Sequence, residues 1–245
     1  MFDKTSDKRG IMASLDNAVM ARLQSHGEKF EIYVDPYLAA KYKENQSSAD
    51  ISDILASEHI YKDIAKGEKA PDELLMKVFE TLDGKKIAEK ILMKGQVHLT
   101  AEQRKEMQEQ KKKQVISFIA RNTINPQTDT PHPPKRIENA MNEARVSIDL
   151  YKSAEEQVND VIKKLRLILP MKFEKREVAV KLGGEYAGTL YHSLAEYGTI
   201  KKEEWMGDGS LVFVIEIPSG IENEFYMFLN KITKGSVQTR VLKRL

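Results

Sequence analysis

The side chains with the clearest chemical potential are two cations at the start of an expected helix. Lys135 and Arg136 directly follow Pro133 and Pro134. Because proline has a fixed φ and no amide hydrogen, this pair suits the first turn of a helix. Cations at a helix start oppose the helix dipole unless an anion offsets them. RNA phosphate is one such anion and Glu138 is the plainer one, and the sequence leaves both open.

Further cations occur where a phosphate backbone could lie, on an expected hairpin, beside a glycine and on a long helix. The candidate RNA-binding side chains are Arg22, Lys29, Lys66, Lys69, Arg121, Lys135 and Arg136. Each also has an interpretation as an ordinary solvated residue. For Arg121 and the lysines at 111–113, acidic neighbours at helical spacing favour simple surface ion pairs. These neighbours are Glu102, Glu106 and Glu109.

A second set of candidates lies near the end of the chain. The candidate partner-binding residues are Lys201, Lys202, Trp205, Lys231 and Lys234, with Arg240 as a further cation. The cations suit either RNA or a protein partner, and the sequence does not separate the two. The single tryptophan stands at a strand end before a glycine turn. Anchoring of the core is its favoured interpretation, and a binding hot spot is the alternative.

Residue types that carry catalysis are scattered. The five histidines lack metal-ligand spacing and the chain has no cysteine, so we expect no metal site and no thiol chemistry. The glycines at 183, 184 and 188 lack the ending of a phosphate-binding loop. We therefore expect no cofactor and no enzymatic activity. His132, between two prolines, is expected to be a surface ring.

The composition fits several small domains rather than one polycation. The chain has 245 residues, and its net charge is +2 from 39 basic and 37 acidic residues. RNA contacts must therefore come from local patches. No stretch approaches a membrane span, and the absence of cysteine is typical of the cytoplasm. We expect a cytoplasmic monomer, with a loose tail over about the first ten residues.

The first part of the chain, residues 1–97, predicts a small α/β domain. Alternating apolar residues on both sides of His26-Gly27 indicate a hairpin. Asp35-Pro36 supplies a cap and a first-turn proline for a helix to about Glu44. Apolar residues at helical spacing predict two more helices, and the second of these ends at Lys94-Gly95.

Residues 98–171 predict a central domain of three helices. Thr100 and Gln103 form a capping box for a long helix to about Arg121. A second helix follows Pro134, after a stiff connector at 125–134. A third begins near Ser153, and apolar residues from Val158 to Leu169 form its buried stripe.

Residues 172–245 predict a ferredoxin-like domain. The apolar pattern changes in the order strand, helix, strand, strand, helix, strand. The middle strands form a hairpin through Gly207-Asp208-Gly209. This βαββαβ order places both helices on one face of a four-stranded antiparallel sheet. The fold class is therefore α+β, with three domains.

Several segments, spread over all three domains, resemble the Shwachman-Bodian-Diamond syndrome protein family of ribosome maturation factors. The matching segments are Asn125–Met141, Gly27–Ile32, Tyr61–Gly67, Ile91–Gly95, Glu203–Trp205 and Thr233–Gly235. Ordered matches of this kind are more specific than one short motif. Asp129 stands where the family usually has glycine, which affects the local backbone because aspartate also tolerates turn conformations. The short C-terminus looks like that of the archaeal form.

The resemblance implies a function as well as the three-domain architecture. Family members bind rRNA of the large ribosomal subunit and act with a translocase-like GTPase. Together these proteins release the anti-association initiation factor. The alternative is a general RNA-binding protein in RNA processing. Neither function needs a catalytic residue in this chain.

Overall fold

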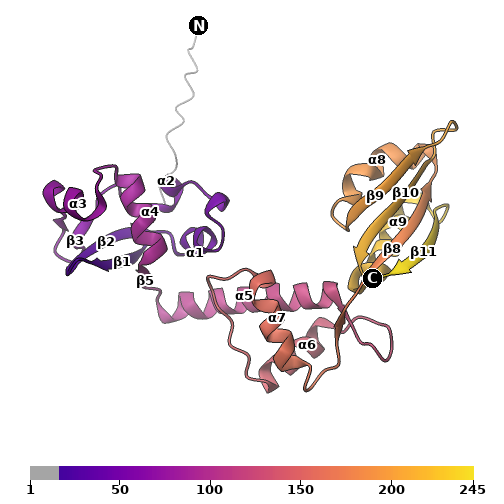
Figure 1. Ribbon diagram of the computed structural model, residues 1–245, viewed down its shortest axis with the longest axis horizontal. Coiled ribbons are helices and arrows are strands. Elements are labelled where there is room, and N and C mark those ends of the chain that lie inside the picture. Colours follow the sequence, from indigo (N-terminus) through magenta and orange to yellow (C-terminus); the bar gives the residue numbers. More distant parts are fainter. Residues whose placement is uncertain (1–16) are drawn as a thin grey trace, which may run out of the picture. The chain divides into compact units, whose positions relative to one another are not determined.

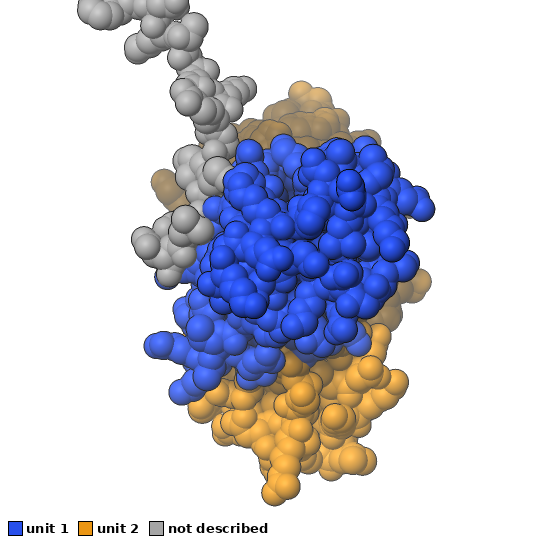
Figure 2. Space-filling model, turned by 90° about the vertical axis from the view of Figure 1, so that its left-hand side faces the viewer, with its two compact units in different colours: residues 1–111, 149–153 blue, residues 112–148, 154–245 orange. Residues whose placement is uncertain are grey.

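The computed structural model describes residues 17–245, so the expected N-terminal tail lies outside the described residues. The chain divides into two compact units, which Figure 2 colours separately. The first holds the described residues up to Lys111 together with Asp149–Ser153, and the second holds Lys112–Ile148 and Ala154–Leu245. No helix among the described residues is both long and apolar enough to cross a membrane.

The first unit is built on a five-stranded sheet with strand order β4-β3-β2-β1-β5 (Figure 1). Its strands are β1 (Val19–Ser25), β2 (Glu28–Val34), β3 (Tyr61–Asp63), β4 (Glu68–Lys69) and β5 (Gln96–Val97). Its helices are α1 (Pro36–Glu44), the 3-10 turn η2 (Gln46–Ser48), α2 (Ile51–Ile54), α3 (Asp72–Phe79) and α4 (Gly84–Lys94). The expected hairpin is confirmed, because Val19 to Ser25 pair in register with Val34 to Glu28.

The helix ends of this unit follow the sequence signals. The Asp35 carboxylate accepts hydrogen bonds from the amides of Tyr37 and Leu38, and Pro36 opens α1. Gly95 ends α4. Side chains from α1, α3 and α4 pack with Phe30 and Ile32 into one buried core. One face of the sheet is therefore covered by helices.

Helix α5 (Ala101–Asn122) contributes residues to both units. It begins with the expected capping box: the Thr100 amide donates to Gln103 Oε1 at 3.0 Å, and the Gln103 amide donates to Thr100 Oγ1 at 3.1 Å. In the second unit, α6 (Pro134–Glu143) and α7 (Ala154–Leu165) lie beside α5 (Figure 1). Apolar side chains of these helices share one core, among them Ile119, Ile137 and Ile162. The predicted three-helix domain is confirmed.

The C-terminal elements form the predicted ferredoxin-like domain. The elements are β8 (Lys175–Leu182), α8 (Gly184–Leu194), β9 (Thr199–Trp205), β10 (Leu211–Pro218), the 3-10 turn η3 (Ser219–Ile221), α9 (Glu222–Thr233) and β11 (Gln238–Arg244). The sheet order β11-β8-β10-β9 is that of a split βαβ fold. Buried residues of α8 and α9 pack against β8 and β10. The short strands β6 (Thr123–Ile124) and β7 (Lys172–Phe173) pair with each other where the helical and ferredoxin-like parts join.

Candidate nucleic-acid interface

The proline-rich connector ends in a helix whose first cations are solvent-exposed. Pro133 caps α6 and Pro134 is its first residue, as expected. Lys135 and Arg136 are exposed at this end of the helix. Lys135 Nζ lies 2.8 Å from Glu138 Oε2, and this hydrogen bond lowers the pKa of Glu138. Arg136 has no ion pair within the described residues. The plainer interpretation therefore holds for Lys135, while Arg136 is available to an external anion.

The connector contains one residue whose backbone is in the left-handed conformation. Asp129 has φ 54°, and its amide donates to the carbonyl of Asn125 at 2.9 Å. Glycine reaches this conformation at no steric cost, and aspartate is one of the few other residues that tolerate it. Inside the connector, His132 is buried at 3% exposure, and its Nε2 lies 2.8 Å from the carbonyl oxygen of Pro170. The expectation of a surface ring was wrong, because this polar contact satisfies the ring inside the fold.

The N-terminal candidates come together on the sheet face opposite the helices. Arg22 and Lys29 alternate onto that face, and Lys69 lies on β4 opposite Tyr61. Arg22 Nε is 2.8 Å from the buried carboxylate of Glu31, so its charge is paired. Lys29 and Lys69 are exposed. This face therefore carries two lysine charges that a phosphate backbone could meet.

Lys66 lies on the turn between β3 and β4. Its Nζ is 3.6 Å from Asp63 Oδ2, and its side chain is 75% exposed. An exposed pair of this kind contributes little to stability, so the side chain can exchange Asp63 for another anion.

The lysine run on α5 is divided among different environments. Lys111 is 8% exposed and pairs with Glu44 of α1, so it is neither an RNA ligand nor a member of a solvated face. The expected ion pairs with acids on the same helix were wrong for this residue. Lys112 donates to the side-chain carbonyl of Asn142. Arg121 is exposed and donates to the carbonyl of Glu196 at 3.2 Å, at the junction with the ferredoxin-like domain.

The structure separates the five partner-binding candidates instead of gathering them. Lys202 is opposite Val214 on the sheet face that α8 and α9 leave open, whereas Lys231 and Lys234 belong to α9 and its C-terminal cap. Lys201 pairs with Glu216 at 3.0 Å. Trp205 is 52% exposed, so the expectation that it anchors the core was wrong. An exposed tryptophan at a strand end fits the alternative, a contact with a partner.

The sheet face that α8 and α9 leave open carries more cations than the sequence analysis assigned to it. Arg240 and Lys202 were among the candidates, and the other cations of this face were missed. The strand register places the following cations there: Lys175, Lys181, Lys202, Arg240 and Lys243. Its acids are Glu177, Glu204 and Glu216, so the face is basic on balance. Lys175 and Lys201 hydrogen-bond to Glu216 and lower its pKa. Strand alternation could have revealed these cations, because it assigns each residue of a strand to one of the two sheet faces.

A buried ion network joins the helical and ferredoxin-like parts of the second unit, and the sequence did not predict it. Arg176 is 7% exposed and faces three carboxylates: Asp129 at 3.1 Å, Glu174 at 3.3 Å and Glu222. Arg244 adds a contact of 2.8 Å to Asp129. Burial opposes the charge of Arg176, but the carboxylates outweigh it and raise the pKa of the guanidinium. The network ties the connector to strand β8 and helix α9.

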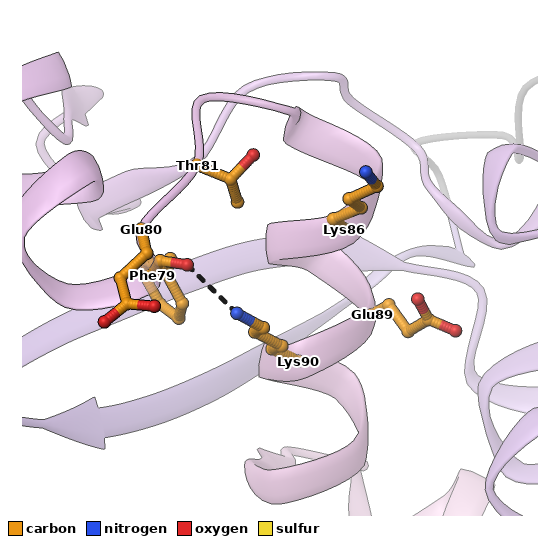
Figure 3. Close-up of a pocket in the computed structure, with 6 residues that line it drawn as sticks. All are labelled: Phe79, Glu80, Thr81, Lys86, Glu89 and Lys90. Atoms are coloured by element: carbon orange, nitrogen blue, oxygen red, sulfur yellow. Dashed lines mark hydrogen bonds between the residues drawn. The ribbon is translucent and has the colours of Figure 1, made fainter.

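A pocket of about 500 Å³ lies at the end of α3 in the first unit (Figure 3). Lys90 Nζ donates to the Phe79 carbonyl oxygen at 3.0 Å and so satisfies the C-terminus of α3. Glu89 accepts a hydrogen bond from Tyr42, whose pKa is raised to about 12 by burial and by this bond. Both groups are engaged in holding the fold. Among the described residues, no group of three or more His, Cys, Asp or Glu residues could hold a metal ion.

The domain order and the basic surfaces define a class: a three-domain α+β protein that presents cations from sheet faces and a helix start. Family models match the chain in the same order. The N-terminal domain model of the Shwachman-Bodian-Diamond syndrome (SBDS) protein matches residues 17–105, the domain II model matches 113–174, and the C-terminal domain model matches 176–244.

Relatives confirm the match over nearly the full length. The ribosome maturation protein SDO1 homolog of Methanothermobacter thermautotrophicus is 49% identical over 95% of this chain and 100% of the relative. The SDO1 homolog of Aeropyrum pernix is 37% identical over 95% of this chain and 99% of its own. The ribosome maturation protein SBDS of Caenorhabditis elegans is 28% identical over 93% of this chain and 90% of the relative. The chain belongs to the SBDS family of ribosome maturation proteins.

Proposed function

We propose that this protein is a ribosome maturation factor that binds rRNA of the large ribosomal subunit. It then helps a translocase-like GTPase to release the anti-association initiation factor. The family supports the general role, since its curated members are named ribosome maturation proteins. The surfaces that support RNA binding are the exposed start of α6 and the cations of the two uncovered sheet faces.

The observation that carries the proposal is the position of Arg136. Its guanidinium charge is exposed at the positive end of the α6 dipole, with no ion pair within the described residues. Such a cation is locally unfavourable, and a phosphate group would remove that cost. The stiff connector before it fixes where this charge is presented.

The proposed role is one of binding and positioning. The buried network around Arg176 supports it, because a fixed junction lets a contact made by the helices orient the ferredoxin-like domain. We propose that the protein works in the cytoplasm as a monomer and catalyses no reaction of its own. Nucleotide hydrolysis by the pure protein would contradict the last point.

Footprinting on purified large subunits tests the RNA target. We propose that protection is confined to one region of the subunit, near the peptidyl-transferase and tRNA sites, and that Arg136→Glu weakens it. Lys77→Glu, an exposed change on α3, is the matched control. Scattered protection of unrelated RNAs with similar affinity would instead support a general RNA-binding protein.

The release step needs its own assay. Large subunits loaded with labelled anti-association factor are mixed with this protein, the GTPase and GTP. Release should require both proteins. Full release by the GTPase alone would contradict this part of the proposal.

A further inference from the structure

The sheet face that the first unit leaves uncovered carries aromatic rings as well as cations. Met20, Arg22 and Gln24 of β1 are opposite Tyr33, Glu31 and Lys29 of β2. Glu31 is in turn opposite Tyr61, which is opposite Lys69. Alternation places all these residues away from the buried side chains of the same strands. We call this surface the outer sheet face.

Three rings meet on the outer sheet face. The ring centroids of Tyr33 and Tyr61 are 6.2 Å apart with the planes at 73°, and those of His59 and Tyr61 are 6.2 Å apart at 84°. Tyr33 and Tyr61 are half-buried and His59 is exposed, and the core of this unit contains none of the three. Because the rings meet edge to face, each contact covers one face of only one of the two rings, whereas a parallel stack would cover a face of both. Their flat surfaces can take a further ring.

The charges on this face favour an anionic ligand. The carboxylate of Glu31 is 4% exposed and is fully engaged: Arg22 donates to one oxygen at 2.8 Å and the Ile64 amide to the other at 2.8 Å. Lys29 and Lys69 have no ion pair within the described residues, so both are left as positive charges on this face. Lys69 Nζ also lies 3.0 Å from His59 Nε2, which holds the imidazole beside Tyr61.

We infer that the outer sheet face binds an unpaired segment of RNA, with bases stacked on Tyr33, Tyr61 and His59 and phosphates against Lys29 and Lys69. Rings combined with cations are the means by which single strands are held without sequence preference. In a duplex the bases stack on one another inside the helix, so no base face is free to stack on these rings. This inference rests on the proposed function, since it names the kind of RNA that the N-terminal domain contacts.

The test measures binding of the full chain to a single-stranded oligoadenylate and to an RNA duplex of the same length. The wild type should favour the single strand. Tyr33→Leu with Tyr61→Leu should weaken oligoadenylate binding by about tenfold or more, because each base–aromatic stack that is lost is substantial. The salt dependence should change little in this variant. Lys29→Gln with Lys69→Gln should instead reduce the slope of log affinity against log salt concentration by about one to two.

Two further variants make the outcome decisive. Tyr33→Phe with Tyr61→Phe keeps the rings and should retain affinity, which also guards against a folding defect in the leucine variant. Lys77→Gln, on the helical side of the sheet, should leave both affinity and slope unchanged. Unchanged oligoadenylate affinity in a folded leucine variant, or equal binding of the duplex, overturns the inference.

Cosedimentation with large subunits separates this inference from the proposed function. If the wild type binds oligoadenylate through the rings but fails to bind subunits, the sheet-face site stands and the ribosomal role fails. If subunit binding is intact while the leucine variant keeps full oligoadenylate affinity, the sheet-face site alone fails.

Discussion

Replacing Arg176 by methionine tests the buried network that joins the helical and ferredoxin-like parts. Methionine keeps an apolar stem in the same space and removes only the charge and its hydrogen bonds. Breaking a buried ion pair from one side costs about 3–5 kcal/mol, since the partner charge is left unpaired. Asp129 keeps Arg244 at 2.8 Å, whereas Glu222 keeps only the neutral hydroxyl of Tyr226 at 2.9 Å within the described residues. We therefore expect a loss of about 3 kcal/mol, the lower end of that range.

The assay is urea denaturation of the full chain, followed by Trp205 fluorescence and far-ultraviolet circular dichroism. Lys181→Met is the matched control, because Lys181 lies on the same strand and is exposed on the opposite face. It should change the unfolding free energy by less than about 0.5 kcal/mol. Adding Glu222→Gln to Arg176→Met should recover part of the loss, giving a coupling of at least about 1 kcal/mol. Equal stability of the Arg176 and Lys181 variants would refute the reasoning.

Three other tests probe separate parts of the molecule. Gly220→Ala would place a Cβ 2.1 Å from a carbonyl oxygen of α5, so it should lower the unfolding free energy by about 1–3 kcal/mol in a melting experiment. Gly188→Ala is the control: nothing lies within 4 Å of its new Cβ, so it should stabilise α8 by up to about 1 kcal/mol. Lys135→Glu with Arg136→Glu should leave the melting temperature unchanged but weaken subunit binding, with a salt slope smaller by about one to two. The pKa of Glu216 is lowered in the fold, so its ion pairs stabilise above the ordinary glutamate pKa of about 4.3 and are lost as the pH falls through the lowered value. Glu216→Gln should accordingly be less stable than the wild type at pH 7, and a gap that persisted unchanged in denaturation at pH 3 would rule this out.

Most of the fold could be predicted because it follows from local signals. The cap at Asp35, the capping box at Thr100 and the proline start of α6 each involve residues within four positions of one another. The hairpins and the βαββαβ order follow from alternation and glycine turns. The short strands β3 to β5 and helix α2 were missed, since two to four residues are too few to show a period.

The candidate site was harder to predict because its contacts are distant in sequence. Arg176 meets Asp129 and Glu222 from positions more than forty residues away, and no local pattern indicates such a network. The wrong expectation for Trp205 has a similar cause. It lies on β9, an edge strand of the sheet, where no further strand of the described residues packs beside it. The cations of the outer sheet face could be predicted, but the rings beside Tyr61 needed the strand pairing.

The most direct test of the central claim is cosedimentation of the pure protein with purified large ribosomal subunits over a series of salt concentrations. We predict that the protein sediments with the subunits at low salt. Its affinity should fall steeply and linearly on a log–log plot, as expected for several phosphate contacts. Failure to sediment with the subunits even at low salt, or an affinity that does not depend on salt, would contradict the account.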